Sequence, residues 1–120
     1  MAGRTVTAGA GTTSELALNA RLPHARPDVG AKTDATTTER LLSREIDAAI
    51  MDAPAARKAA LESDGRLVVL DMPLSVERYA IAIAPTKGAL AAELDRALAE
   101  VRSNGGLDEL NERFGLRSDR

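Results

Sequence analysis

The feature that most constrains this chain is an alternation between short apolar runs and amphipathic helix patterns. Each apolar run is bounded by turn residues, which is typical of a buried strand. The helix patterns begin after Thr or Asp and end near Gly or Pro. The pattern predicts strands at residues 5–8, 29–33, 46–51, 67–70 and 79–83, and helices that begin near residues 12, 36, 54, 90 and 107.

This alternation predicts an α/β fold. Strands that alternate with helices usually form a mostly parallel sheet with helices on both faces. We therefore expect a three-layer sandwich around a sheet of about five strands, of the flavodoxin-like type. The 120 residues are the size of one domain. We expect one lobe over 1–120, with its core in 1–77 and a crossover strand and C-terminal helices in 78–120.

The composition narrows the classes of function. The chain has no Cys, one Tyr, one Phe and no Trp, and its net charge is −2. Cysteine chemistry is therefore excluded, and the shortage of basic stripes and aromatic rings argues against nucleic-acid binding. No apolar run is long enough to span a bilayer, so we expect no membrane insertion. The first residues do not resemble a signal peptide, which predicts a cytoplasmic location as expressed.

The first candidate site is the glycine-rich turn that follows the first predicted strand. Gly9-Ala10-Gly11 leads into Thr12, Thr13 and Ser14, and Glu15 stands three residues after Thr12 as in a capping box. Such a turn directs backbone N–H groups and the positive end of the helix dipole outward, so it can receive a carboxylate or phosphate. The same pattern also fits an ordinary, well-capped strand-to-helix turn, and it is neither a dinucleotide fingerprint nor a P-loop.

The second candidate is Asp52, which ends the predicted strand 46–51. Its carboxylate could receive an ammonium group, or it could cap the helix that begins at Pro54. An anion cradle and a carboxylate at one sheet edge would together complement a zwitterion. Ligand binding is therefore predicted at Gly11, Thr12, Thr13, Ser14 and Asp52.

Other polar residues suggest no catalytic or metal site. His24 is the only histidine, and the loop around it offers no partner base. The spacing of Asp28, Asp34 and Asp47 does not indicate a metal site, and Arg40, Arg44, Arg57 and Lys58 are expected on solvated helix faces. We expect no cofactor, no metal and no enzymatic activity, because Asp52 is the one carboxylate that could be placed at the site.

Several segments together resemble the amino-acid-binding receptors of bacterial ABC importers. Residues 11–15 (GTTSE) look like the turn that binds the ligand carboxylate, and 45–54 (EIDAAIMDAP) look like the strand whose Asp binds the α-amino group. Residues 73–83 resemble the hinge crossing, and 104–110 resemble the end of the receptor. The resemblance covers nearly the whole chain in the right order, and it corresponds to the second lobe plus the C-terminal tail.

The resemblance implies a periplasmic solute-binding protein in which Thr12 and Thr13 contact the ligand carboxylate and Asp52 contacts the ammonium. It also implies a first lobe that supplies an arginine and aromatic walls, and that lobe is the expected natural partner. The sequence departs from the family pattern at Gly9, at Asn111 and Arg113, and at Arg57 and Lys58. These departures suggest an engineered or reconstructed single lobe.

The resemblance leaves two arrangements open for the predicted strand 79–83. It could join the sheet of its own lobe in a monomer, or pair with another chain in a swapped homodimer. The functions expected are weak amino-acid binding at a half-site or a purely structural scaffold without ligand. A dehydratase-like activity is the third possibility, and it is disfavoured because no lid is expected and Asp52 is the one carboxylate that could be placed at the site.

Overall fold

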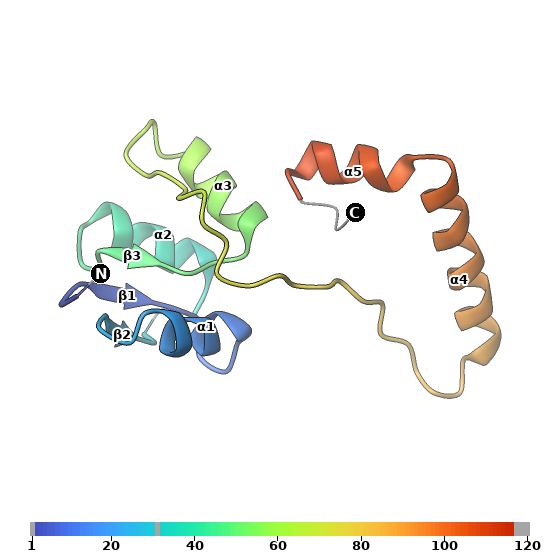
Figure 1. Ribbon diagram of the computed structural model, residues 1–120, viewed down its shortest axis with the longest axis horizontal. Coiled ribbons are helices and arrows are strands. Elements are labelled where there is room, and N and C mark those ends of the chain that lie inside the picture. The colour runs from blue at the N-terminus through green and yellow to red at the C-terminus, as the bar shows by residue number, and fades with distance from the viewer. Residues whose placement is uncertain (1, 31, 117–120) are drawn as a thin grey trace. The chain divides into compact units, whose positions relative to one another are not determined.

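The predicted alternation of strands and helices is present over most of the chain. The computed structural model describes residues 2–30 and 32–116. The elements are labelled in Figure 1, and their order matches the prediction except that two predicted strands do not form. They are β1 (Thr5–Thr7), α1 (Thr13–Arg21), β2 (Arg26–Asp28), α2 (Asp34–Leu42), β3 (Ala48–Ala49), α3 (Ala53–Leu61), α4 (Gly88–Ser103) and α5 (Gly106–Phe114).

The three strands form one small parallel sheet in the order β2-β1-β3. Val6 on the central strand is in register with Pro27 on one side and Ala48 on the other. Asp47 fastens β3 to the start of β1, because its carboxylate accepts the Thr5 N–H at 2.8 Å and an Arg4 N–H at 3.0 Å. The α/β class predicted from the sequence is therefore confirmed.

The core lies where α1 covers the central strand. Val6, Ala8 and Leu18 are buried together, and partly buried apolar side chains surround them: Leu22, Ala25, Ala48 and Ile50. The core is aliphatic, as the shortage of aromatic residues requires.

The chain divides into two compact units, Met1–Val76 and Glu77–Arg120. The sequence placed a boundary between residues 77 and 78, next to this division. Every side chain that is buried among the described residues belongs to the first unit. In the second unit, α4 and α5 contain no buried residue.

The second predicted strand lies earlier in the sequence than expected. Residues 26–28 form β2, whereas the described residues of the predicted strand 29–33 are in no strand, and residue 31 lies outside the described residues. Pro27 is tolerated because β2 is an edge strand. The Arg26 N–H donates to Arg4 O, just before β1, so alternation directs the Pro27 nitrogen away from the sheet.

The helix α2 also begins earlier than its predicted capping box. The prediction paired Thr36 with Glu39, but the N-cap is Thr33, and its hydroxyl accepts the Thr36 N–H at 3.1 Å. The Thr36 hydroxyl in turn accepts the Thr33 N–H at 3.2 Å. Thr36 thus fills the place usually taken by Glu or Gln in a capping box.

The predicted strands 67–70 and 79–83 do not form in this structure. Both segments lie outside any helix or strand, and their large apolar side chains are exposed except for half-buried Leu67. The sheet of the described residues therefore has three strands, where about five were expected. A strand needs a neighbouring strand to accept and donate its backbone hydrogen bonds. An apolar run in the sequence indicates only that the segment tends to be buried.

The start of the segment 67–70 is nevertheless held in place. Buried Ser63 follows α3, and its hydroxyl accepts the Leu67 N–H at 3.0 Å and donates to Ala60 O at 2.7 Å. The turn between them uses left-handed backbone at Asp64 and Gly65, as the Asp-Gly pair predicts for a helix end.

Candidate functional site

The two predicted site segments follow neighbouring strands. The turn 9–12 follows β1 and Asp52 follows β3, and these two strands pair in parallel. Because parallel strands end at the same edge of a sheet, both segments lie at the C-terminal edge, where ligands bind in α/β folds. The topology therefore brings together the two halves of the predicted site.

The glycine-rich turn is held by Thr12, which is the N-cap of α1. Its hydroxyl donates to Gly9 O at 2.7 Å and accepts the Glu15 N–H at 3.4 Å. Gly11 has φ of +73°, a left-handed conformation that favours glycine. At Gly9, a Cβ would stand 3.1 Å from Thr12 Cγ2, so a larger residue there would press on the cap.

The anion-binding position of this turn is partly filled by the chain itself. The Gly11 N–H donates to the Glu15 carboxylate at 2.7 Å. The sequence predicted a capping box, in which the Glu15 carboxylate would accept the Thr12 N–H, but the Thr12 N–H donates instead to Gly9 O at 3.3 Å. Glu15 therefore occupies a donor that an external carboxylate would use.

Two backbone N–H groups at the start of α1 differ from the Gly11 N–H, which is bonded to Glu15. The N–H groups of Thr13 and Ser14 belong to the first helical turn, where the helix offers no acceptor. Thr13 is exposed and Ser14 is half-buried. Together with the helix dipole, these N–H groups are the part of the predicted cradle that can receive an anion.

Asp52 occupies the N-cap position of α3 without using its side chain as a cap. Its backbone is extended, its carbonyl accepts the Ala56 N–H at 2.9 Å, and no side-chain capping bond forms. Pro54 stands in the first turn, as predicted. The side chain of Asp52 is exposed, so its carboxylate is open to a cation from solvent.

A second acidic residue at this sheet edge was not predicted to interact. Asp28 ends β2, and its carboxylate accepts N–H groups of Arg40 at 2.7 and 3.2 Å. Buried Thr7 donates its hydroxyl to the same carboxylate at 2.9 Å, and the Gly30 N–H does so at 3.2 Å. Arg40 also contacts Glu45 at 2.7 Å.

This network corrects the expectation that Arg40 lies on a solvated helix face. Its side chain is 19% exposed and that of Asp28 is 25% exposed. Hydrogen bonds from the Arg40 guanidinium, more than any other contact, lower the pKa of Asp28 to about 2, and the same bonds raise the pKa of Arg40. A correct placement of β2 would have put Asp28 at the end of a strand, at the same sheet edge as the segment that follows β3.

The remaining candidates carry no metal site in the part of the chain that is described. No group of three or more His, Cys, Asp or Glu residues there could hold a metal ion. His24 is exposed in its loop. None of the described helices is long and apolar enough to cross a membrane.

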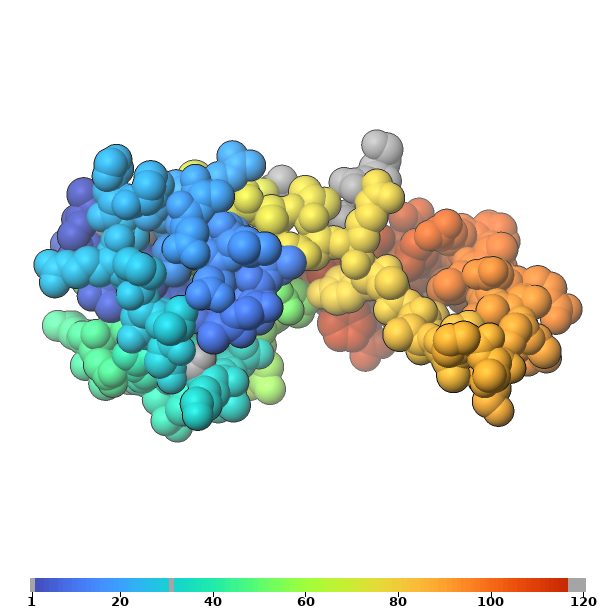
Figure 2. All heavy atoms as spheres, turned by 90° about the horizontal axis from the view of Figure 1, so that it is seen from below, coloured from blue at the N-terminus to red at the C-terminus, as the bar shows by residue number. Residues whose placement is uncertain are grey.

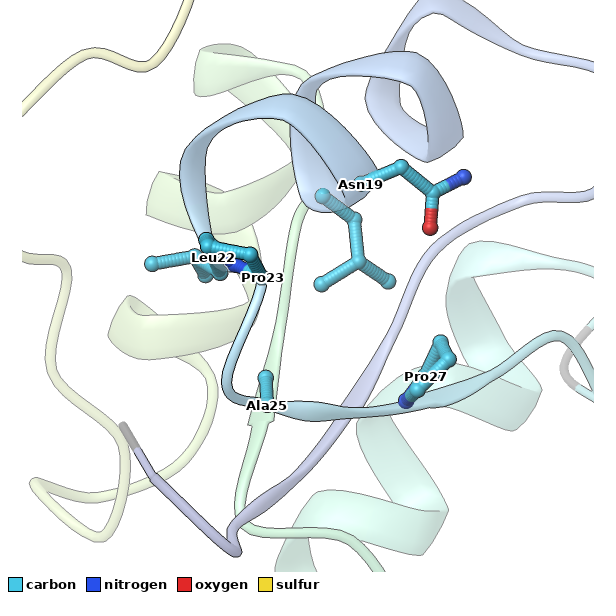
Figure 3. Close-up of a pocket in the computed structure, with 6 residues that line it drawn as sticks. Asn19, Leu22, Pro23, Ala25 and Pro27 are labelled. Carbon is cyan, nitrogen blue, oxygen red and sulfur yellow. The ribbon is translucent and has the colours of Figure 1, made fainter.

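A shallow cavity of about 190 Å³ lies away from the predicted site (Figure 3). It is formed by the second half of α1 and by the chain that leads into and includes β2, and its lining mixes apolar side chains with polar atoms: Leu18, Asn19, Leu22, Pro23, Ala25 and Pro27. None of the predicted site residues lines it. The cavity offers no charged group to a zwitterion.

Comparisons of the chain with known protein families, with curated proteins and with solved structures found no match.

Proposed function

We propose that this chain is a non-enzymatic solute-binding lobe with a half-site for an amino acid, similar to the receptors of bacterial ABC importers. The observation that carries the proposal is the placement of the α1 N-terminus and Asp52 after two paired parallel strands. One segment offers N–H donors and the other a carboxylate. This pair complements the two charges of a zwitterion.

Each charged group of the amino acid has its own binding group on the chain. The α-carboxylate is received by the Thr13 and Ser14 N–H groups within the turn that Gly11 and Thr12 shape. The α-ammonium is received by Asp52. A single open edge buries little of a ligand, so binding to this lobe alone is about millimolar or weaker.

A flavodoxin-like lobe of five strands is part of the proposal. The segments 67–70 and 79–83 have the apolar character of strands, but the structure places both outside its three-stranded sheet. In the proposed assembly a first lobe completes the binding cleft.

One observation favours a second function, a structural scaffold without a ligand. The Glu15 carboxylate already accepts the Gly11 N–H at 2.7 Å. An internal carboxylate at this place stabilises the turn and competes with an external one. A chain selected for folding alone would keep such a contact.

The test is a titration of ¹⁵N-labelled protein with a panel of amino acids, followed by amide chemical shifts. We expect saturable shifts at residues 11–15 and 52, and their loss in the Asp52→Asn variant. Asp34→Asn, which changes an exposed carboxylate on α2, is the matched control and keeps the response. Amino-acid amides and N-acetyl amino acids, which each lack one charge, bind more weakly than the zwitterion.

The Glu15→Gln variant separates the two functions. If the half-site exists, neutralising Glu15 weakens the internal competitor and strengthens binding of the amino acid. If neither the natural chain nor Glu15→Gln shows saturable shifts at high millimolar ligand, the half-site is excluded and the scaffold function stands.

A further inference from the structure

The segment Tyr79–Ile83 alternates strictly between large and small apolar side chains. Tyr79, Ile81 and Ile83 are 74%, 56% and 37% exposed, and Ala80 and Ala82 stand between them. The segment forms no helix or strand, and its backbone runs as an extended trace between α3 and α4 (Figure 1); its atoms lie among the yellow and gold spheres of Figure 2. In an extended backbone, alternate side chains point to opposite faces. The segment is therefore a potential strand with one large apolar face.

The alternation is self-complementary about Ile81. When two identical segments pair antiparallel about a two-fold axis at residue 81, Ile81 lies opposite Ile81 of the second copy. Tyr79 then lies opposite Ile83, and Ala80 opposite Ala82. All large side chains fall on one face, and the aromatic residue meets a β-branched residue, which is a favourable cross-strand pair.

We propose that a second copy of this chain covers the segment Tyr79–Ile83 through this two-fold antiparallel pairing. The contact is isologous, so it closes at a dimer. Pro85 stands two residues beyond Ile83 and has no N–H to donate, which limits the paired length. This inference does not depend on the proposed amino-acid site.

The exposed apolar side chains of the segment suit such a dimer. Tyr79, Ile81 and Ile83 are 74%, 56% and 37% exposed. Because a large aromatic side chain alone can bury about 150–250 Å², the three together offer on the order of several hundred Å² per copy. A standard interface buries about 800 Å² per partner, so this pairing supplies a substantial share of one.

The oligomeric state is the first test, measured by sedimentation equilibrium from about micromolar to about millimolar protein. We expect the natural chain to form a dimer. Ile81→Lys sets two like charges opposite each other and weakens dimerisation by about 100-fold or more. Ala82 lies on the other face of the strand, so Ala82→Lys changes the dimer dissociation constant by only about threefold or less.

A cysteine cross-link tests the register. The chain has no Cys, so Ile81→Cys introduces a unique thiol. Opposed residues in an antiparallel pair have Cα atoms about 4.5–5.5 Å apart, which suits a disulfide. Under mild oxidation Ile81→Cys should form a covalent dimer much faster than Leu61→Cys, an equally unique and exposed thiol on α3. A monomer at every concentration, or equal cross-linking of the two variants, would overturn the proposal.

Discussion

At the scale of single residues, Asp28 and Asp52 show how surroundings decide what a carboxylate does. Asp28 is the last residue of β2 and Asp52 follows β3, and both strands belong to the same parallel sheet. Asp28 is bound by Arg40, Thr7 and the Gly30 N–H, so its charge is neutralised within the fold. Asp52 is exposed and makes no side-chain cap, so its charge is available to a ligand.

The Asp28 network predicts a specific loss of stability in acid. The pKa of Asp28 falls from 3.8 to about 2 on folding, so the folded state favours the carboxylate form. This stabilisation is present above about pH 4 and is lost as the pH falls toward 2. Because the pair is partly solvated, it contributes roughly 1–2 kcal/mol to the free energy of unfolding.

Urea unfolding at pH 7, 4 and 2.5 measures this contribution. Between pH 4 and 2.5 the natural chain should lose about 0.5–1 kcal/mol more than Asp28→Asn, in which the titrating group is absent, because a folded pKa of about 2 leaves part of the stabilisation at pH 2.5. Asp95→Asn changes an exposed carboxylate on α4 and should follow the natural chain. Equal losses in the natural chain and Asp28→Asn would show that the Arg40 pair does not stabilise the fold.

At the scale of elements, α1 supplies Leu18, the largest fully buried side chain among the described residues. Leu18 is 1% exposed and packs against Val6 and Ala8 of the central strand segment. No aromatic residue shares this small core, so few neighbours can move to fill a cavity. Leu18 therefore contributes a large share of the packing between helix and sheet.

Replacement of Leu18 by Ala should lower the free energy of unfolding by about 2–5 kcal/mol. Leu16→Ala removes the same atoms from an exposed position on the same helix, and we expect a change of about 0.5 kcal/mol or less. Urea unfolding followed by circular dichroism compares the two variants. Similar losses of unfolding free energy in the two variants would show that Leu18 is not a core residue.

Local signals explain which elements could be predicted from the sequence. The start of α1 at Thr12 and the turn at Gly11 depend on residues within one turn, and both were predicted correctly. The capping box of α2 was missed because Thr36 takes the place of an acidic residue. The Asp28–Arg40 pair was missed because it depends on where β2 pairs with β1, which a local pattern does not encode.

The candidate site could be predicted only in part for the same reason. The residues of the cradle and Asp52 follow from turn and strand patterns, and their common edge follows from parallel pairing. The contact between Glu15 and Gly11 was not predicted, because the capping-box pattern assigns that carboxylate to the N–H of the next residue. The segments 67–70 and 79–83 were predicted as strands because their pattern indicates burial without naming a partner.

At the scale of the whole molecule, burial is concentrated in one of the two compact units. The buried side chains described here all lie within residues 2–76, and the described part of 77–120 has none. The free energy of folding must therefore come mainly from the first unit, because apolar burial is its dominant favourable term.

A fragment of residues 1–76 should consequently fold without the remainder of the chain. We expect its amide spectrum to reproduce the signals of β1, α1 and α2 from the full chain, with a urea midpoint close to that of the full chain. The complementary fragment 77–120 serves as the comparison and should show little cooperative unfolding. A disordered spectrum for 1–76 would mean that the core needs contacts from the second part.

Pro27 on the edge strand β2 leaves the β3 edge as the one side of the sheet that can readily pair with another strand. Because the Pro27 nitrogen is directed outward and carries no hydrogen, the outer side of β2 lacks a donor at its centre. An open fibril needs two competent edges on every subunit, one to receive a strand and one to offer the next. This sheet can accept a strand readily beside β3 alone, so its edge pairing ends after one addition and the proline acts as a guard against amyloid-like polymerisation.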